Sequence, residues 1–239
     1  MKGKVMSRII RSEERGHRDY GWLNTYHSFS FSDYYDPKKM NFGPLRVLNH
    51  DIVEAGKGFP THPHKDMEIV TVIIKGELAH SDSMGKSEVI REYEVQKMSA
   101  GTGVYHSEFN NSPDKLVELM QIWIIPDRTG LQPSYEQIKF SPEQRKNKLL
   151  KIAGNSGNEG EIFISQKSEI YLSDLEKGKS LNFKPAENFG TYIYLYEGEI
   201  EVNGEKLNKG DAIQFEDTNE LNIAAISNSS FILFEVALK

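Results

Sequence analysis

Two short clusters of potential metal ligands stand out in the sequence, His62-Pro63-His64 and, further along the chain, His106-Ser107-Glu108. Residues two apart on a β-strand project from the same face, so each pair can direct both side chains to one point. Together the pairs predict a four-ligand metal site. Three imidazoles and one carboxylate suit Fe(II), Mn, Ni, Cu or Zn, and they leave two positions of a six-coordinate ion free. This pattern favours a reactive metal over a structural one.

A second carboxylate, Glu68, also follows the first cluster. It lies four residues after His64, on the same strand face by parity, but about 13 Å along an extended strand at ~3.3 Å per residue. Glu108 is only two residues from His106, so its shorter reach makes it the better ligand. We expect Glu68 to be either a structural carboxylate or a group that orients a ligand imidazole.

The overall composition excludes several classes of function. The chain has 239 residues with 29 basic and 35 acidic side chains, a net charge of −6, and no long run of Lys or Arg, which argues against direct contact with nucleic acid. It has no cysteine, so disulfides, thiolate metal sites and a Cys nucleophile are excluded. The N-terminus lacks the apolar segment of a signal peptide, and no stretch approaches about eighteen apolar residues, so we expect a cytoplasmic protein with no membrane contact.

The hydrophobic pattern predicts an all-β protein. Short runs rich in β-branched and aromatic residues, separated by Gly, Asn or Asp, are typical of strands in a sandwich or barrel: 45–53, 68–74, 89–95, 116–125, 161–166, 169–172, 191–196, 199–202 and 231–236. One helix is expected to begin at Ser141-Pro142-Glu143, where Ser can cap and Pro suits the first position, and to continue through 144–151. A turn-rich loop follows at 154–158.

A weak internal repeat predicts two copies of one fold. Ile74-Lys75-Gly76-Glu77-Leu78 parallels Tyr196-Glu197-Gly198-Glu199-Ile200, each a strand, a Gly turn and a returning strand. We expect a metal-binding domain over 1–135, a linker with a short helix over 136–154 and a second domain over 155–239. All seven histidines lie at or before residue 106, so the second domain is expected to hold no metal.

Longer motifs extend this picture. The spacing Gly56, His62-x-His64, Glu68, Gly76 resembles the first motif of the cupin superfamily, and Gly103, His106, Asn110 resembles the second. The segments 58–64, 81–85 and 98–108 resemble the bacterial members of the pirin family. Pirins are bicupins, so the resemblance implies two antiparallel β-barrel (jelly-roll) domains joined by a short helix, with one metal in the first.

The resemblance also implies an activity. It implies His62, His64, His106 and Glu108 as metal ligands, Fe(II) as the favoured ion with Ni, Mn, Cu or Zn possible, and a quercetin 2,3-dioxygenase reaction on a flavonol. That reaction uses dioxygen, releases carbon monoxide and would employ Glu108 to accept the proton of a substrate hydroxyl. A bicupin supplies its barrel pair within one chain, so we expect a monomer. The alternative is a pirin-like regulator without turnover, whose metal state alters a surface that binds a protein partner.

Other interpretations remain open at this point. A cupin-type sugar-phosphate isomerase would need clustered Lys and Arg, and the sequence near the histidine clusters offers no compelling set. The aromatic stretch 22–35, Phe42 and Phe59 could stack on a flat ligand or simply form core. His80 could line the cavity mouth, although a surface or hydrogen-bonded role is favoured, and a structural role is favoured for His17, His27 and His50.

Overall fold

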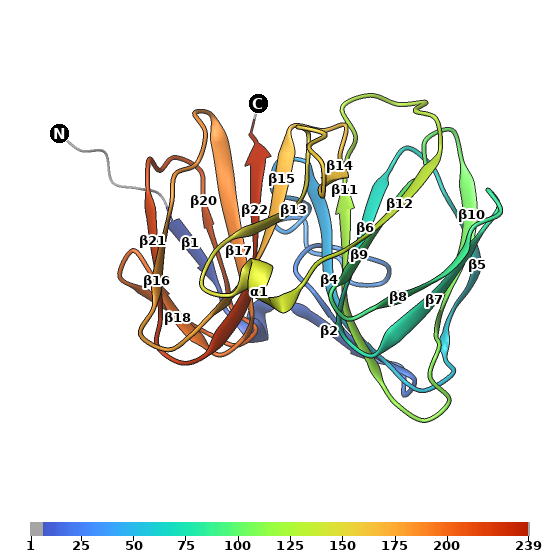
Figure 1. Cartoon of the computed structure of the whole chain (residues 1–239), viewed down its shortest axis with the longest axis horizontal. Coiled ribbons are helices and arrows are strands. Elements are labelled where there is room, and N and C mark those ends of the chain that lie inside the picture. Colours follow the sequence, from blue (N-terminus) through green and yellow to red (C-terminus); the bar gives the residue numbers. More distant parts are fainter. Residues whose placement is uncertain (1–6, 239) are drawn as a thin grey trace.

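The alternating apolar residues of this chain form four β-sheets, arranged as two lobes that lie side by side (Figure 1). The protein is described here from a computed structural model over residues 7–238. In each lobe a seven-stranded sheet is accompanied by a four-stranded sheet, and every strand pairing except β13 (Leu150–Gly154) with β14 (Ile162–Phe163) is antiparallel. The predicted all-β fold with one short helix is confirmed.

The N-terminal lobe holds both histidine clusters. Its larger sheet has the order β12 (Ser134–Lys139), β9 (Glu94–Ser99), β6 (Glu68–Lys75), β11 (Val117–Ile124), β4 (Leu45–Val53), β3 (Leu23–His27), β2 (Gly16–Asp19). Its smaller sheet has the order β5 (Gly58–His64), β10 (Val104–Asn110), β7 (Glu77–Asp82), β8 (Ser87–Arg91). The space between these two sheets contains the candidate site.

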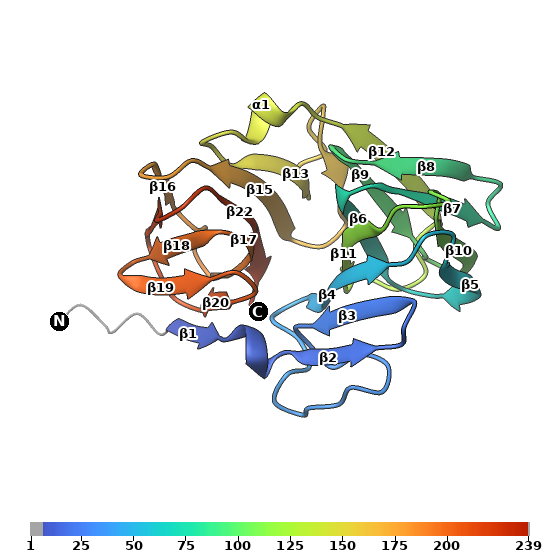
Figure 2. The same cartoon turned by 90° about the horizontal axis from the view of Figure 1, so that it is seen from below.

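The C-terminal lobe repeats the arrangement. Its larger sheet has the order β1 (Ser7–Ile10), β20 (Ala212–Phe215), β17 (Phe189–Glu197), β22 (Ser229–Ala237), β15 (Ser168–Leu175), β13, β14. Its smaller sheet has the order β16 (Ser180–Phe183), β21 (Leu221–Ala225), β18 (Glu199–Val202), β19 (Glu205–Asn208). Strand β1 comes from the start of the chain and lies beside β20 (Figure 2), so the N-terminal segment joins the C-terminal lobe before a 3-10 helix, η1 (Ser12–Glu14), leads to β2.

The largest hydrophobic core lies between the lobes. It joins Leu48, Val70 and Ile122 of the first seven-stranded sheet to Ile170 and Phe234 of the second, all essentially buried. In a strand, the residues that alternate with these must face the other way, into the lobe. Alternate residues of β4 and β11 are thereby directed into the N-terminal lobe and are available for a site there.

Three local predictions were wrong. The strand expected over 161–166 is limited to the two residues of β14. The strand expected over 89–95 is divided between β8 and β9 by a turn, where Tyr93 adopts a φ of 65°. The helix expected to continue to 151 is only α1 (Pro142–Arg145), because Lys146 is extended and Asn147 has a φ of 54°. The following residues pair in β13 with β15 instead, since strand pairing with the core sheet overrides local helix propensity.

The expected internal repeat is visible in the backbone. Gly76 and Gly198 turn between equivalent strand pairs with φ of 84° and 86°. A Cβ at either position would meet a backbone carbonyl oxygen, at 2.7 Å for Leu116 and 2.3 Å for Asn228, so the shared Gly answers a shared steric need. The domain limits expected at 135, 154 and 155 stay a prediction.

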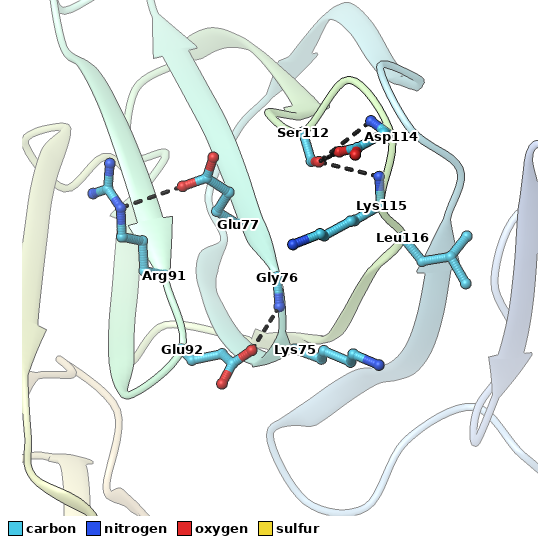
Figure 3. A pocket seen from close by; sticks show the side chains of 9 residues that line it. All are labelled: Lys75, Gly76, Glu77, Arg91, Glu92, Ser112, Asp114, Lys115 and Leu116. Carbon is cyan, nitrogen blue, oxygen red and sulfur yellow. Dashed lines mark hydrogen bonds and ion pairs between the residues drawn. The ribbon is translucent and has the colours of Figure 1, made fainter.

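A charged groove lies beside two turns, the turn at Gly76 between β6 and β7 and the turn between β8 and β9 (Figure 3). Arg91 pairs with Glu77 at 3.3 Å, and the Gly76 amide donates to Glu92 at 3.0 Å. No residue of either histidine cluster lines this groove. Despite its volume of about 760 Å³, it is therefore separate from both histidine clusters.

Candidate metal centre

The two histidine clusters meet because their strands pair. In the β5–β10 register, His62 is directly opposite His106, and His64 is opposite Val104. Along β10 the side chains alternate between buried and partly or fully exposed, with His106 and Glu108 both on the buried face. His-Pro-His was expected where a strand begins, but His64 is the last residue of β5. Pro63 is tolerated because β5 is an edge strand of its sheet, where a missing amide donor is harmless.

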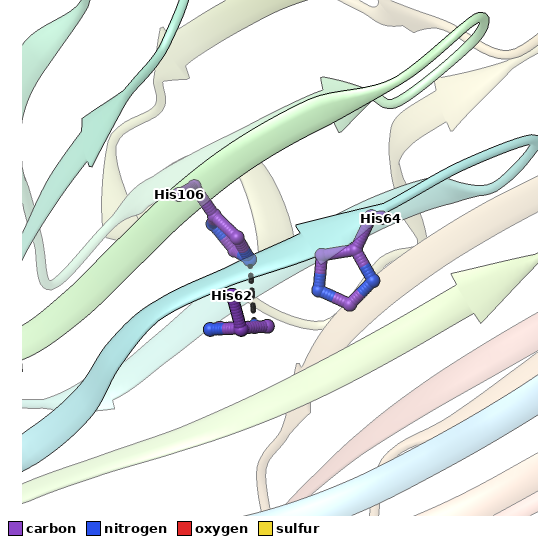
Figure 4. Close-up of side chains that lie close together, drawn as sticks. All are labelled: His62, His64 and His106. Atoms are coloured by element: carbon purple, nitrogen blue, oxygen red, sulfur yellow. Dashed lines mark hydrogen bonds between the residues drawn. The ribbon is translucent and has the colours of Figure 1, made fainter.

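The three imidazoles converge (Figure 4). Potential ligand nitrogens of His62, His64 and His106 all lie within 4.8 Å of one another. The Nε2 atoms of His62 and His106 are 3.1 Å apart. The Nδ1 atom of His62 lies 2.8 Å from the Pro60 carbonyl oxygen, which favours the tautomer with the proton on Nδ1 and a lone pair on Nε2. This lone pair points at a second imidazole, an arrangement suited to a shared cation.

Burial favours the neutral form of His64 and His106, which is the form that binds metals. Burial, and then the neighbouring His62, lowers the pKa of His64 to about 4. Burial, and then His62, His64 and His80, lowers the pKa of His106 well below its ordinary value. Only a neutral imidazole offers a lone pair, so the residues fit a divalent metal ion.

Glu108 lies beside this triad rather than within it. The β5–β10 pairing has a bulge in β5 between the partners of His106 and Glu108, which are His62 and Phe59, and the group of close ligand atoms that contains Glu108 contains His80 and His106. Its Oε2 accepts a hydrogen bond from Gln121 at 2.8 Å, whereas its Oε1 is buried without a hydrogen-bond partner. Burial raises the pKa of Glu108 to about 7, opposed by the Gln121 bond and supported by the nearby Asp51. The carboxylate thus has one held oxygen and one free oxygen.

His80 is buried, with 1% of its surface exposed, and it is opposite Glu108 in the β7–β10 register. Its Nε2 lies 2.9 Å from Asp82 Oδ2, and its Nδ1 has no hydrogen-bond partner. The sequence favoured a surface or hydrogen-bonded role over the cavity mouth. The side chain is hydrogen-bonded and also lies against the candidate ligands His106 and Glu108.

A row of polar side chains crosses the seven-stranded sheet opposite the imidazoles, with successive members paired in register: His27, Asn49, Gln121, Thr71 and Gln96. His27 Nδ1 lies 2.8 Å from Asn49 Oδ1, and Gln121 reaches across to Glu108. Sequence reasoning missed this row. The alternation within 45–53 and 117–124 could have shown polar residues on one strand face, but not that the face lines a site.

An aromatic cavity of about 430 Å³ opens beside the candidate metal ligands and includes His62 and Glu108 in its wall. Five aromatic side chains line it: Tyr20, Trp22, Phe31, Phe59 and Trp123. Among the described lining residues there is no Lys or Arg. Phe59 and part of the stretch 22–35 thus line the cavity, whereas Phe42 is buried in the core between the lobes.

The remaining candidates serve the scaffold. Glu68 accepts hydrogen bonds from the Ser165 amide at 3.0 Å and hydroxyl at 3.0 Å, which ties the N-terminal lobe to the C-terminal lobe. His50 lies on the face of β4 toward the C-terminal lobe, where Tyr194 and Glu118 contact its two ring nitrogens at 2.7 and 2.8 Å. His17 is exposed on β2.

Comparisons with known proteins agree with this architecture. Residues 9–124 match the family model described as Pirin, and residues 151–236 match the model described as Quercetinase C-terminal cupin domain. The Quercetin 2,3-dioxygenase of Escherichia coli K12 is 41% identical over 95% of this chain and 97% of its own length. The Pirin-like protein of Caulobacter vibrioides is 34% identical over 94% of this chain and 97% of its own.

A solved structure is also similar. The bacterial pirin YhhW of Escherichia coli in complex with nickel(II) superimposes with a TM-score of 0.92 at 38% identity, over 97% of this chain and 99% of that chain. Within residues 7–238 no helix has the length and apolar character needed to span a membrane. With two family matches, one on each lobe, and relatives similar over nearly the whole length, this chain belongs to the pirin family of bicupins.

Proposed function

We propose that this protein is a metal-dependent dioxygenase of the quercetin 2,3-dioxygenase type, acting on flavonols. The observation that carries the proposal is the convergence of three imidazoles, one of which, that of His62, lines the wall of an aromatic cavity. The size of the cavity, about 430 Å³, is in the range of sites that enclose a small aromatic ligand. The 41% identity to the Quercetin 2,3-dioxygenase of Escherichia coli K12 supports the same reaction.

We propose His62, His64, His106 and Glu108 as the ligands of one divalent ion, with Fe(II) favoured. Nickel is supported as an alternative by the similar YhhW structure, which is a complex with nickel(II), and the donor set also suits Mn, Cu or Zn. A bound ion would supply Lewis acidity to a substrate oxygen and access to dioxygen chemistry. On the basis of pirin-family membership and the aromatic cavity, we propose a flavonol and dioxygen as the reaction partners. We also propose that the protein is a cytoplasmic monomer.

The protein's own groups would position the substrate and move its proton. The free Oε1 of Glu108 would accept the proton of the substrate hydroxyl that faces the imidazoles, while Gln121 holds Oε2. Trp22, Phe59 and Trp123 would hold the flat ring system and keep water away from it. The absence of Lys and Arg from the described cavity wall argues against a sugar-phosphate substrate.

The test is anaerobic reconstitution with Fe(II) and other divalent ions, followed by oxygen uptake and carbon monoxide release with quercetin. His62→Ala and Glu108→Gln should each abolish most of the turnover, and His62→Ala should also weaken metal binding. His17→Ala is the matched control, because His17 is exposed and lies outside the site. Tight metal binding without turnover of any flavonol would refute the enzymatic proposal.

One observation favours a second candidate function, the metal-responsive regulator. On β10, the strand that carries His106 and Glu108, the outer face exposes Tyr105 by 58% and Phe109 by 41%. A change at the buried ligands would act on the same strand as this exposed aromatic pair. This function would be supported if the metal changed affinity for a protein partner while no flavonol was turned over.

A further inference from the structure

The cavity contains a polar group that the metal centre does not use, the carboxyl of Asp51. Asp51 lies on β4 between Thr25 of β3 and Leu119 of β11, on the face that points into the N-terminal lobe. It lines the cavity, and only 2% of its surface is exposed. The Thr25 hydroxyl donates a hydrogen bond to its Oδ1.

That hydrogen bond satisfies only part of the carboxylate. Among the side-chain hydrogen bonds of residues 7–238, none goes to Asp51 Oδ2, and no Lys or Arg forms an ion pair with Asp51. A buried carboxylate with a single neutral donor is costly, and its second oxygen can accept further hydrogen bonds. The cavity therefore presents a second carboxylate acceptor, besides Glu108, that a ligand could use.

The rest of the wall restricts what can supply the missing donor. Aromatic side chains dominate it, and no cationic residue among the described lining residues would attract an anionic ligand. A neutral flat molecule with hydroxyl groups on its rim matches both features, because its faces stack on Trp22 and Phe59 while a hydroxyl donates to the carboxylate. A flavonol carries such hydroxyls in addition to the 3-hydroxyl that would face the metal ligands.

We propose that Asp51 is a specificity-determining residue that accepts a hydrogen bond from a flavonol hydroxyl other than the 3-hydroxyl. This inference rests on the proposed function, because it assumes the same substrate class. It predicts that the protein selects polyhydroxylated flavonols over flavonols that carry the 3-hydroxyl alone. A site built around a buried acceptor discriminates strongly against a ligand that leaves the acceptor unpaired.

The experiment measures binding in the metal-free protein, so it does not depend on turnover. Both tryptophans of the chain, Trp22 and Trp123, line the cavity, so quenching of their fluorescence reports a bound flavonol directly. Quercetin is compared with 3-hydroxyflavone for wild type and Asp51→Asn. We expect wild type to prefer quercetin, and Asp51→Asn to weaken quercetin binding by roughly tenfold or more while 3-hydroxyflavone binding stays within about twofold.

Glu54→Gln is the matched control, because it removes one exposed negative charge just beyond the end of β4 and should leave both affinities unchanged. Equal losses for the two ligands in Asp51→Asn would overturn the inference, since a general structural defect affects both. A wild type that binds both ligands equally would also overturn it, and this measurement needs no variant. Selective binding without turnover on metal loading would refute the dioxygenase and leave the role of Asp51 intact.

Discussion

Replacing Asp51 by Asn should stabilise the protein at neutral pH and not at acidic pH. Burial raises the pKa of Asp51 to about 6 from its ordinary 3.8, against the lowering effects of Thr25 and then Arg15. Between these two pH values the folded state keeps a proton that the unfolded state releases. The contribution of the Asp51 carboxyl to the stability of the fold is therefore complete below its pKa in the unfolded state. This contribution is lost as the pH rises through about 6, its pKa in the folded state.

The magnitude follows from the two pKa values. Their difference corresponds to about 3 kcal/mol, at about 1.36 kcal/mol per pKa unit, and Asp51 is buried deeply enough that solvent screening does not reduce it greatly. Asparagine keeps an oxygen for Thr25 but buries a new NH₂ group, at a cost of about 1 kcal/mol. Asp51→Asn should thus gain about 2 kcal/mol at pH 8 and lose about 1 kcal/mol below pH 4.

The assay is guanidinium unfolding of chelator-treated protein from about pH 3 to about pH 8. Trp22 and Trp123 both belong to the N-terminal lobe, so their fluorescence follows the unfolding of the part that contains Asp51. Repeating the comparison in a Glu108→Gln background removes the electrostatic coupling between the two carboxyls. A stability difference between Asp and Asn that is the same at every pH would refute the reasoning.

Three further outcomes are expected. Gln121→Leu removes the donor to Glu108 and should lower kcat roughly tenfold or more, with metal content unchanged by elemental analysis; an unchanged kcat would show that the hydrogen bond does not position Glu108. Glu68→Ala removes the bonds to Ser165 between the lobes and should cost about 1–3 kcal/mol in urea unfolding while flavonol affinity stays the same. Saturating Ni(II) at about 100 times Kd should stabilise the fold by about 2.7 kcal/mol, and His62→Ala should abolish this gain in thermal melts; an equal gain in the variant would place the metal elsewhere.

The parts predicted from the sequence are those that local spacing determines. His62, His64 and His106 could be predicted because strand parity fixes which side chains share a face, and the β5–β10 register then brings the pairs together. The division of residues 89–95 between two strands could not be predicted, because Tyr93 takes a positive φ without the Gly or Asn that would signal a turn. The early end of the helix at Arg145 also depends on distant pairing, between β13 and β15.

The groups around the imidazoles could not be predicted from the sequence either, because their contacts also depend on distant strands. Gln121 reaches Glu108 only because the two sheets of the N-terminal lobe face each other at a particular offset, which no local pattern encodes. Asp51 is equally compatible with a solvated strand position until β4 is seen to pair on both sides. Sequence thus indicated the candidate metal ligands, whereas the other residues of the cavity wall required the fold.

A comparison of the two lobes shows what the site costs the fold. Inside the C-terminal lobe, one continuous apolar cluster fills the space between the sheets, with Ile193, Leu195, Phe231 and Leu233 among its buried members. Inside the N-terminal lobe, the apolar residues divide into two smaller clusters, and the polar row with its unsatisfied buried atoms lies on the same inner face. Buried polar groups without partners destabilise a fold. The C-terminal lobe, with its complete apolar core, can therefore stabilise the chain while the N-terminal lobe keeps the polar groups of the candidate site. Both seven-stranded sheets pack into one shared core, and this core couples the two lobes, so the stability of the C-terminal lobe also supports the N-terminal lobe.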